Sequence, residues 1–221
     1  MGFFENTTPT NLRTLILNNL SSNQQILAVS KLQPVEKIKD LYMQGQTNFA
    51  ENYIQEALKK IDQLSVYNIC WHLIGPIQKN KVKLLKKNFE FIHSVDSLEL
   101  AEKISEYALK INHIQKCFIQ LNLAKELTKF GYFKENFLKE WPLLKRLSGL
   151  KIVGLMTMPP LKNEPEKNRV FFKELKNIGD NLNLPEYSMG TSLDYQIALA
   201  EGATWIRIGT KLFGERTMLQ K

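Results

Sequence analysis

Eight short apolar stretches alternate with amphipathic stretches along this chain, and the alternation constrains the fold more than any other feature. The apolar stretches have the length of buried strands. The stretches between them repeat apolar residues at spacings of three and four, which is typical of helices packed on a sheet. We therefore expect strands over residues 26–31, 48–52, 69–75, 89–95, 117–123, 151–157, 186–189 and 204–209.

The expected helices fill the gaps between these strands. Gly45 and Gly202 are placed to close two of them as C′ glycines. Asp96 is the expected N-cap of another, with Glu99 three residues later as in a capping box. The helices are expected over residues 34–44, 53–64, 78–88, 97–111, 134–147, 166–180 and 192–201, with an extra helix over 8–22 before the first strand and a helical turn in the tail 210–221.

The order of elements predicts the fold class. Eight strands that alternate with helices over about 200 residues indicate a (β/α)8 TIM barrel. An open doubly wound sheet is the alternative. Since no linker or compositional break divides the chain, we expect one domain over residues 1–221.

Charge raises the question of a polyanionic partner. The net charge is +8, and 24% of the residues are charged. The lysines are spread along the expected helix surfaces, so we expect a solvated basic exterior. A nucleic-acid-binding module, with clustered lysines and aromatic platforms, is the less favoured alternative. The lysines in question include Lys59, Lys60, Lys79, Lys81, Lys83, Lys86 and Lys87.

Cysteines, histidines and the N-terminus predict the compartment. Cys70 and Cys117 stand in apolar surroundings and are expected to be free thiols. The three histidines have no metal-ligand spacing, so no metal site is expected. The N-terminus lacks the pattern of a signal peptide, and no apolar run reaches the ~20 residues of a membrane span. We therefore expect a cytoplasmic protein that does not enter the membrane.

Lys31 lies where the first expected strand ends and a loop begins. In α/β folds this edge is where ligands bind. Taken alone, such a lysine is more often a mobile surface charge. The alternative is a partly desolvated amine that forms a Schiff base with a carbonyl.

Two turns rich in small residues follow the last two expected strands. They are residues 188–192, which include Ser188 and Gly190, and Gly209-Thr210. The first turn alone is better explained as a helix cap, with Ser192 as the N-cap. Together they occupy the two places where barrels often bind phosphate. A phosphate and a carbonyl that an amine can attack are both present in pyridoxal 5′-phosphate (PLP).

Arg207 lies inside the last expected strand, two residues before Gly209. Its neighbours Ile206 and Ile208 point to the opposite side of the sheet. A buried arginine is rare unless it is paired, so a specific partner is expected for it.

Seven segments of the chain carry a family resemblance. They are Ala28-Val29-Ser30-Lys31, residues 49–57, residues 71–81 beginning Trp71-His72-Leu73-Ile74-Gly75-Pro76, residues 93–97, residues 154–159, Ser188-Met189-Gly190 and Arg207-Ile208-Gly209-Thr210-Lys211-Leu212-Phe213-Gly214. In this order they resemble the pyridoxal phosphate homeostasis protein family, single-domain relatives of the alanine racemase barrel. Ala50 and Thr191 depart from the family pattern, which has Gly and Met there.

The resemblance implies a PLP site and roles for its residues. Lys31 would hold PLP as a Schiff base, and Arg207 would face the pyridine nitrogen. Asn52 and Met156 would line the pocket, with His72 nearby on its strand. Trp71 is expected in the core. The residues implied for the phosphate are Ser188, Gly190, Gly209 and Thr210.

The resemblance also bears on activity. Racemisation needs acid and base groups on both faces of the substrate. The racemases supply one of them from an added β-domain, which we do not expect here, and an arginine at the pyridine nitrogen weakens the electron sink. The expectation is a PLP-binding protein of PLP homeostasis and amino/keto-acid balance, without strong turnover and with no catalytic residue assigned. A weak racemase or related PLP enzyme is the alternative. PLP-dependent apoenzymes are candidate partners, and a monomer is expected.

Overall fold

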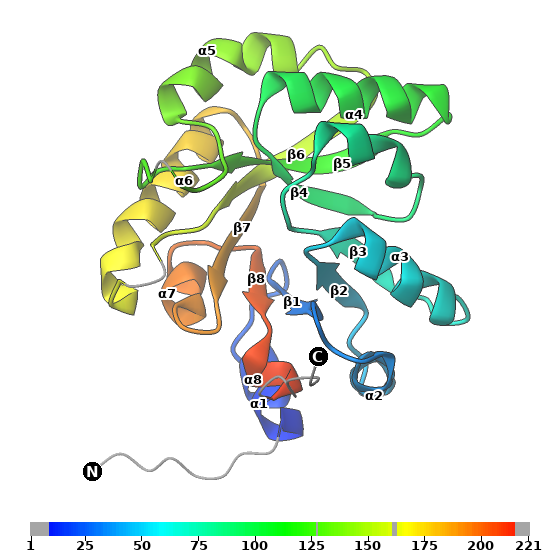
Figure 1. Ribbon diagram of the computed structural model, residues 1–221. Coiled ribbons are helices and arrows are strands. Elements are labelled where there is room, and N and C mark those ends of the chain that lie inside the picture. Colours follow the sequence, from blue (N-terminus) through cyan, green and yellow to red (C-terminus); the bar gives the residue numbers. More distant parts are fainter. Residues whose placement is uncertain (1–8, 127, 161–162, 215–221) are drawn as a thin grey trace.

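The computed structural model of the protein describes residues 9–126, 128–160 and 163–214. Its eight parallel strands follow one another around a closed barrel, with helices on the outside (Figure 1). The first strand pairs with both the second and the last, as in Ala28 beside Phe49 and Leu27 beside Arg207. The TIM barrel is therefore confirmed, and the open sheet is wrong because no strand of this sheet is left at an edge.

The strands lie within a few residues of their predicted positions. Several strands end at a different residue from the predicted one, so some residues predicted inside a strand lie in the loop after it. The strands are β1 (Gln25–Val29), β2 (Asn48–Glu51), β3 (Cys70–Leu73), β4 (Phe91–Val95), β5 (Gln115–Leu121), β6 (Leu150–Thr157), β7 (Glu186–Thr191) and β8 (Trp205–Ile208).

The helices also follow the predicted order. They are α1 (Pro9–Leu17), α2 (Val35–Met43), α3 (Ile54–Gln63), α4 (Leu98–Lys110), α5 (Lys134–Leu144), α6 (Arg169–Asn181), α7 (Tyr195–Ala200) and α8 (Thr210–Phe213), with the 3₁₀ segments η1 (Lys79–Leu84) and η2 (Pro165–Asn168). The helix predicted over residues 8–22 is the shorter α1, and the tail beyond α8 lies outside the described residues.

The helix predicted over residues 78–88 is instead the 3₁₀ segment η1. Val82 and Leu85 are both buried there and stand three residues apart. A spacing of three fits the 3₁₀ period, in which residues three apart lie on one side. With three lysines in its six residues and no second apolar row to bury, η1 has little reason to continue as an α-helix.

Two predicted helix caps are corrected by the structure. The N-cap of α4 is Ser97, whose hydroxyl accepts a hydrogen bond from the Leu100 N–H at 3.3 Å, and not Asp96. The N-cap of α7 is Asp194, so the proposed cap at Ser192 is wrong. Gly45 and Gly202 do follow helix ends, with φ of +86° and +90°. Such left-handed backbone is the reason for glycine at C′.

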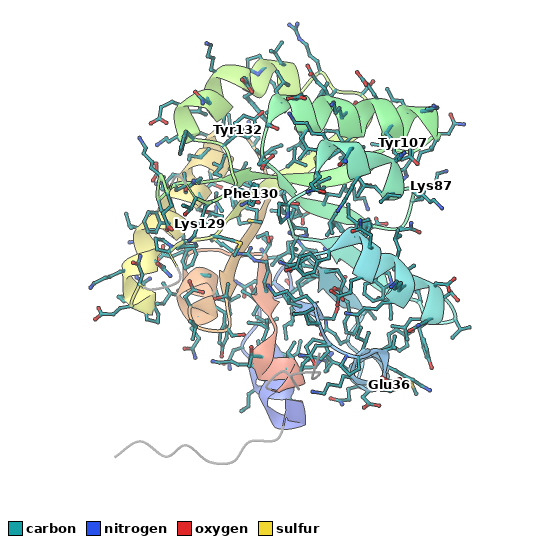
Figure 2. All side chains as sticks on the ribbon, viewed as in Figure 1. Glu36, Lys87, Tyr107, Lys129, Phe130 and Tyr132 are labelled. Carbon is teal, nitrogen blue, oxygen red and sulfur yellow. The ribbon has the colours of Figure 1, made fainter. Side chains whose placement is uncertain are left out.

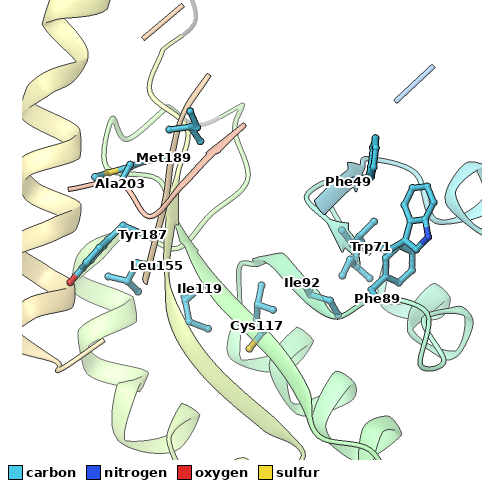
Figure 3. Packing of buried hydrophobic residues seen from close by; sticks show 14 of the residues in the cluster. Phe49, Trp71, Phe89, Ile92, Cys117, Ile119, Leu155, Tyr187, Met189 and Ala203 are labelled. Atoms are coloured by element: carbon cyan, nitrogen blue, oxygen red, sulfur yellow. The ribbon is translucent and has the colours of Figure 1, made fainter. Parts of the chain in front are cut away.

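The core has two parts. The larger part lies between the strands and the surrounding helices and includes Phe49, Trp71, Ile92 and Tyr187 (Figure 3), as predicted for Trp71. The smaller part fills the barrel and consists of Leu27, Ala50, Phe118, Val153, Met156 and Trp205. Alternate residues of a strand point to opposite sides of the sheet, which explains the division.

The barrel mouth is shaped by the loops after the strands. The loop after β5 carries Lys129 and Phe130 (Figure 2), and Lys129 Nζ donates to the Pro159 carbonyl after β6 at 3.0 Å. On the side of β1 and β8, Lys37 of α2 donates to the Phe213 carbonyl of α8 at 2.9 Å. Among the described helices, none combines the length and apolar character that crossing a bilayer requires. Cys70 and Cys117 are free thiols, as predicted.

Candidate functional site

Lys31 lies at the carboxyl end of β1, in the turn formed by residues 30–33. β1 ends at Val29, two residues earlier than the sequence predicted, so the lysine follows the strand instead of ending it. The Gln33 N–H donates to the Ser30 carbonyl at 3.0 Å and closes the turn. Lys31 is half-buried. Leu27 and Val29 of β1 pack with the barrel interior, and Lys31 follows them in the turn at the mouth.

The strand order brings Asn52 and Gly209 to either side of Lys31. β2 and β8 both pair with β1, and each of these residues follows the end of its strand. The Asn52 side-chain oxygen Oδ1 is buried and has no hydrogen-bond partner within the described residues. A Cβ on Gly75, after β3, would come within 2.0 Å of the Asn52 carbonyl oxygen. Only glycine allows this close approach, which fixes the Asn52 backbone.

The end of β7, with Ser192 after it, lies beside the turn after β8. Thr191 pairs with Arg207 in the sheet, and the Gly209 N–H donates to Ser192 Oγ at 3.4 Å. We call residues 190–192 and 209–210 the paired turns. Gly190 has φ of +88°, and a Cβ on it would lie 2.5 Å from the Ala198 Cβ. Both observations require glycine there.

Asp194 holds the first of the paired turns in shape. Its Oδ1 accepts from the Thr191 N–H at 2.6 Å and from the Thr191 hydroxyl at 2.9 Å, and its Oδ2 accepts from Asn168 Nδ2 at 2.8 Å. The donors of Thr191 are therefore used inside the protein. Thr210, the first residue of α8, is exposed, so its hydroxyl is accessible from outside.

Arg207 is buried in β8 and finds its partners on β7 and β6. Its Nη1 donates to the Ser188 carbonyl at 2.6 Å and to the Ser188 hydroxyl at 2.9 Å, and Nη2 donates to the Thr157 carbonyl at 2.8 Å. These bonds use three of the five guanidinium N–H groups. Burial lowers the pKa of Arg207 to about 10, so it stays charged at neutral pH.

A chain of buried hydrogen bonds runs from Arg207 down the barrel. His93 Nδ1 lies 2.8 Å from Ser188 Oγ, and His93 Nε2 lies 2.9 Å from His72 Nδ1. His72 Nε2 lies 3.4 Å from Asn48 Oδ1. Ser188, His93 and His72 are fully buried. We call these three residues the histidine relay.

The hydrogen bonds of the histidine relay can all be donated in one direction, from Arg207 toward Asn48. Arg207 can only donate, so the Ser188 oxygen accepts from it and its single O–H is left for His93 Nδ1. His93 then carries its proton on Nε2 and donates to His72 Nδ1, while the Nε2 proton of His72 points to Asn48. Burial lowers the pKa of His72 to about 3 and that of His93 well below the usual value. Both rings are therefore neutral at ordinary pH, as this arrangement requires.

The structure thus groups most of the predicted site residues. Lys31, Asn52, Gly190, Gly209 and Thr210 lie at the ends of four adjacent strands. Ser188, His72 and Met156 lie inside the barrel, Met156 within the smaller core. His93 was not predicted as a site residue, although its position in β4 puts it on the same side as Phe91, inside the barrel. Within the described residues, no three His, Cys, Asp or Glu side chains are grouped to bind a metal.

Comparison with known proteins shows where the chain belongs. Residues 10–217 match the family model described as alanine racemase, N-terminal domain. A pyridoxal phosphate homeostasis protein of Aquifex aeolicus is 41% identical over 198 residues, 87% of each chain. The chain belongs to the pyridoxal phosphate homeostasis protein family. Another family member, from Synechocystis, is 41% identical over 208 residues, 91% of this chain and 95% of that protein.

Solved structures agree with this family. PipY of Synechococcus elongatus, solved without PLP, is 35% identical, with a TM-score of 0.90 over 94% of this chain and 100% of that chain. PipY with PLP bound gives a TM-score of 0.88 with the same identity and coverage. An alanine racemase of Clostridium difficile is 20% identical, with a TM-score of 0.75 over 96% of this chain and 60% of that chain. At that identity, the racemase shows the shared barrel fold alone.

Proposed function

We propose that this protein binds PLP through the amine of Lys31 and serves in PLP homeostasis and amino/keto-acid balance, without strong catalytic turnover. The observation that carries the proposal is the grouping of Lys31 with Asn52 on one side and the paired turns on the other. Family membership supports it, since PipY was solved with PLP bound at 35% identity.

The residues at the barrel mouth fit PLP chemically. PLP supplies an aldehyde, which condenses with a primary amine to form a C=N bond and release water, and a phosphate that needs hydrogen-bond donors. Lys31 would be the amine. The buried Asn52 Oδ1, which has no partner among the described residues, would accept a hydrogen bond from the ring substituents. The paired turns would supply backbone N–H groups and the Thr210 hydroxyl to the phosphate.

Four predicted residues would act from inside the barrel in this proposal. Arg207 would face the pyridine nitrogen with the guanidinium N–H groups that its bonds to Ser188 and Thr157 leave over. Ser188 was predicted to bind the phosphate, but it is fully buried and its hydroxyl contacts Arg207 and His93, so in this proposal it would act on the ligand only by orienting Arg207. His72 would contribute through its hydrogen bond to His93. Met156, which is fully buried within the smaller core, would form part of the pocket floor.

Two features favour a carrier over an enzyme. A charged Arg207 donates hydrogen bonds but does not release a proton at neutral pH. It therefore does not favour the protonated pyridine ring that carbanion chemistry uses. Tyr187 and Tyr195, which could otherwise supply a second acid or base group, are used in packing. The single O–H of Tyr187 is shared between Asp180 Oδ1 and the Leu184 carbonyl, each 2.7 Å away, and Tyr195 lies under Lys211. The names of the family members, which refer to homeostasis, agree with this.

The proposal has further parts that rest on the sequence. The chain is proposed to act as one PLP-binding unit, as a monomer in the cytoplasm, with PLP-dependent apoenzymes as partners that receive the cofactor. Sedimentation of the PLP-loaded protein tests the monomer, and transfer of PLP to a purified apoenzyme tests the partner class.

One experiment separates the carrier from the racemase alternative. The purified protein is titrated with PLP while its visible absorbance is recorded, and the loaded protein is then incubated with L-alanine in D₂O. We expect a visible band and saturable binding, with very slow deuterium exchange at the alanine Cα. Racemisation at an ordinary enzyme rate, on the order of 1–10³ per second, would instead establish the enzyme.

A further inference from the structure

We propose that a buried ion cluster behind Lys31, formed by Glu51, Glu56 and Lys60, is a positioning device that holds the Lys31 amine in place for its carbonyl partner. This inference rests on the proposed function of Lys31. The three residues lie on β2 and α3, and none of them belongs to the predicted site.

Lys60 overturns one prediction from the sequence. It was expected on a solvated helix surface, as its neighbour Lys59 is, but its side chain is only 9% exposed. Its Nζ donates to Glu51 Oε1 at 2.8 Å, to Glu56 Oε1 at 2.6 Å and to the Ser30 carbonyl at 2.7 Å. These three acceptors use all three protons of the ammonium group. Lys60 therefore anchors this region and is not a second reactive amine.

The ion cluster holds the backbone on both sides of Lys31. On one side, the Ser30 carbonyl accepts from Lys60, and the Ser30 hydroxyl donates to Glu51 Oε1 at 2.7 Å. On the other side, the Leu32 N–H donates to Glu56 Oε1 at 2.6 Å. The residue between these two anchors is Lys31. Its Cα and the direction of its side chain are therefore set by contacts that the ion cluster makes.

The backbone at Leu32 shows why such anchors are needed. Leu32 has φ of +59°, in the left-handed region that side-chain-bearing residues avoid. It is also exposed, so it gains little from packing. A conformation of this kind persists only where its surroundings impose it. The bond from the Leu32 N–H to Glu56, together with the turn bond from Gln33 to Ser30, imposes it here.

The make-up of the ion cluster also favours a positioning role over simple stability. Two carboxylates share one ammonium group, and Glu51 Oε2 is buried with no hydrogen-bond partner among the described residues. Burial raises the pKa of Glu51 against the opposing effect of Lys60. Apolar side chains of similar size would stabilise such a region at least as well. They would not bind the Ser30 carbonyl or the Leu32 N–H.

The test compares Lys60→Met with the matched control Lys59→Met, which removes an exposed lysine one residue away. PLP affinity is measured by titration of the visible band. The intrinsic reactivity of Lys31 is measured without PLP, by reductive methylation with formaldehyde and cyanoborohydride followed by peptide mass spectrometry. Lys211 in the same sample serves as the internal reference. Circular dichroism confirms that each variant is folded.

We expect Lys60→Met to lower PLP affinity by 10-fold or more and to change the methylation rate of Lys31 relative to Lys211 by at least 3-fold. Lys59→Met should change neither. Folded Lys60→Met with both quantities unchanged overturns the inference. If the wild type binds no PLP but the methylation rate of Lys31 still changes in Lys60→Met, the proposed function fails and the positioning role stands.

A second pair of variants keeps the test decisive if Lys60→Met does not fold. Glu56 is partly exposed, with 23% of its side chain accessible, so substitutions there are better tolerated. In Glu56→Gln, the amide oxygen can still accept from Leu32 and Lys60, and we expect Lys31 reactivity and PLP affinity within 3-fold of the wild type. Glu56→Leu has no acceptor and should lose affinity as Lys60→Met does. Equal PLP affinity and equal Lys31 reactivity in Glu56→Gln and Glu56→Leu would contradict the inference.

Discussion

Arg207 and Ser188 are joined twice, through the carbonyl of Ser188 at 2.6 Å and through its hydroxyl at 2.9 Å from the same guanidinium nitrogen. The hydroxyl therefore has an acceptor role toward Arg207 and a donor role toward His93. This links the charged residue at the barrel mouth to the neutral histidines below it. The orientation of Arg207 thus depends on residues that no ligand needs to touch.

Ser188→Ala removes both roles at once. We expect the free energy of unfolding to fall by about 1–3 kcal/mol, because His93 Nδ1 and one Arg207 N–H lose their partner in a buried place. Urea unfolding measures the change. Ser148→Ala, at an exposed turn, is the control and should lie within about 0.5 kcal/mol of the wild type. Equal stability of the two variants would contradict the relay.

The buried histidines predict a pH dependence of stability. In the unfolded chain a histidine has a pKa of about 6.5, whereas burial lowers the pKa of His72 to about 3 and that of His93 well below 6.5. Below pH 6.5 the unfolded state therefore binds more protons than the folded state. Stability must fall as the pH falls from 6.5 toward 4, by about 1.4 kcal/mol per pH unit for each histidine.

Urea unfolding between pH 5 and 8 measures this slope. The comparison is the His72→Gln/His93→Gln double variant, in which the slope should largely disappear. Glu51 contributes a slope of the opposite sign. Because its pKa is raised, the folded state binds a proton at a higher pH than the unfolded state does, so this contribution to stability grows as the pH falls. This contribution is present in both proteins and cancels in the comparison. An equal slope in both proteins would mean that the histidines are not buried as neutral rings.

Gly190 and Gly214 offer a matched pair for the packing at the end of β7. Both have positive φ, +88° and +76°, but a Cβ on Gly190 would lie 2.5 Å from the Ala198 Cβ, whereas no atom of the described residues lies within 4 Å of one on Gly214. Gly214→Ala should cost about 1–3 kcal/mol from the backbone alone, because φ of +76° with ψ of −176° is a conformation that essentially only glycine adopts. Gly190→Ala should cost about 1–3 kcal/mol more, because it also overpacks. Thermal and urea unfolding measure the loss of stability in each variant. Equal losses in Gly190→Ala and Gly214→Ala would contradict the close packing of α7 against Gly190.

Thr210 tests the position of the phosphate. Thr210→Val keeps the shape of the side chain and removes the hydroxyl, so we expect PLP affinity to fall by about 1.5–3 kcal/mol, the value of a hydrogen bond to a charged group. Thr210→Ser keeps the hydroxyl and should bind within a few-fold of the wild type. Titration of the visible band measures both. Unchanged affinity in a folded Thr210→Val would place the phosphate elsewhere.

The barrel and the ends of its strands could be predicted from the sequence because both follow from local patterns. Apolar alternation with helices predicts the strands, and the strand ends predict where Lys31 and Gly209 lie. The N-cap of α4 shows the limit of such local patterns: the sequence predicted Asp96, whereas the observed backbone makes Ser97 the cap.

The residues that sequence reasoning missed depend on contacts between distant parts of the chain. His93 and Ser188 are 95 positions apart, and only the closed barrel brings them together. Lys60 has Glu56 four residues before it, which is the signal that could have drawn attention to it. Its burial could not be predicted in this way, because it depends on Glu51 of the neighbouring strand and on the Ser30 carbonyl.

The central claim is that Lys31 carries PLP, and chemical trapping tests it most directly. The protein is loaded with PLP, reduced with borohydride and digested, and the labelled peptide is sequenced by mass spectrometry. The account predicts one label on Lys31, with the visible band and the label both absent in a folded Lys31→Ala variant. A label on another lysine, with PLP binding intact in Lys31→Ala, would contradict it.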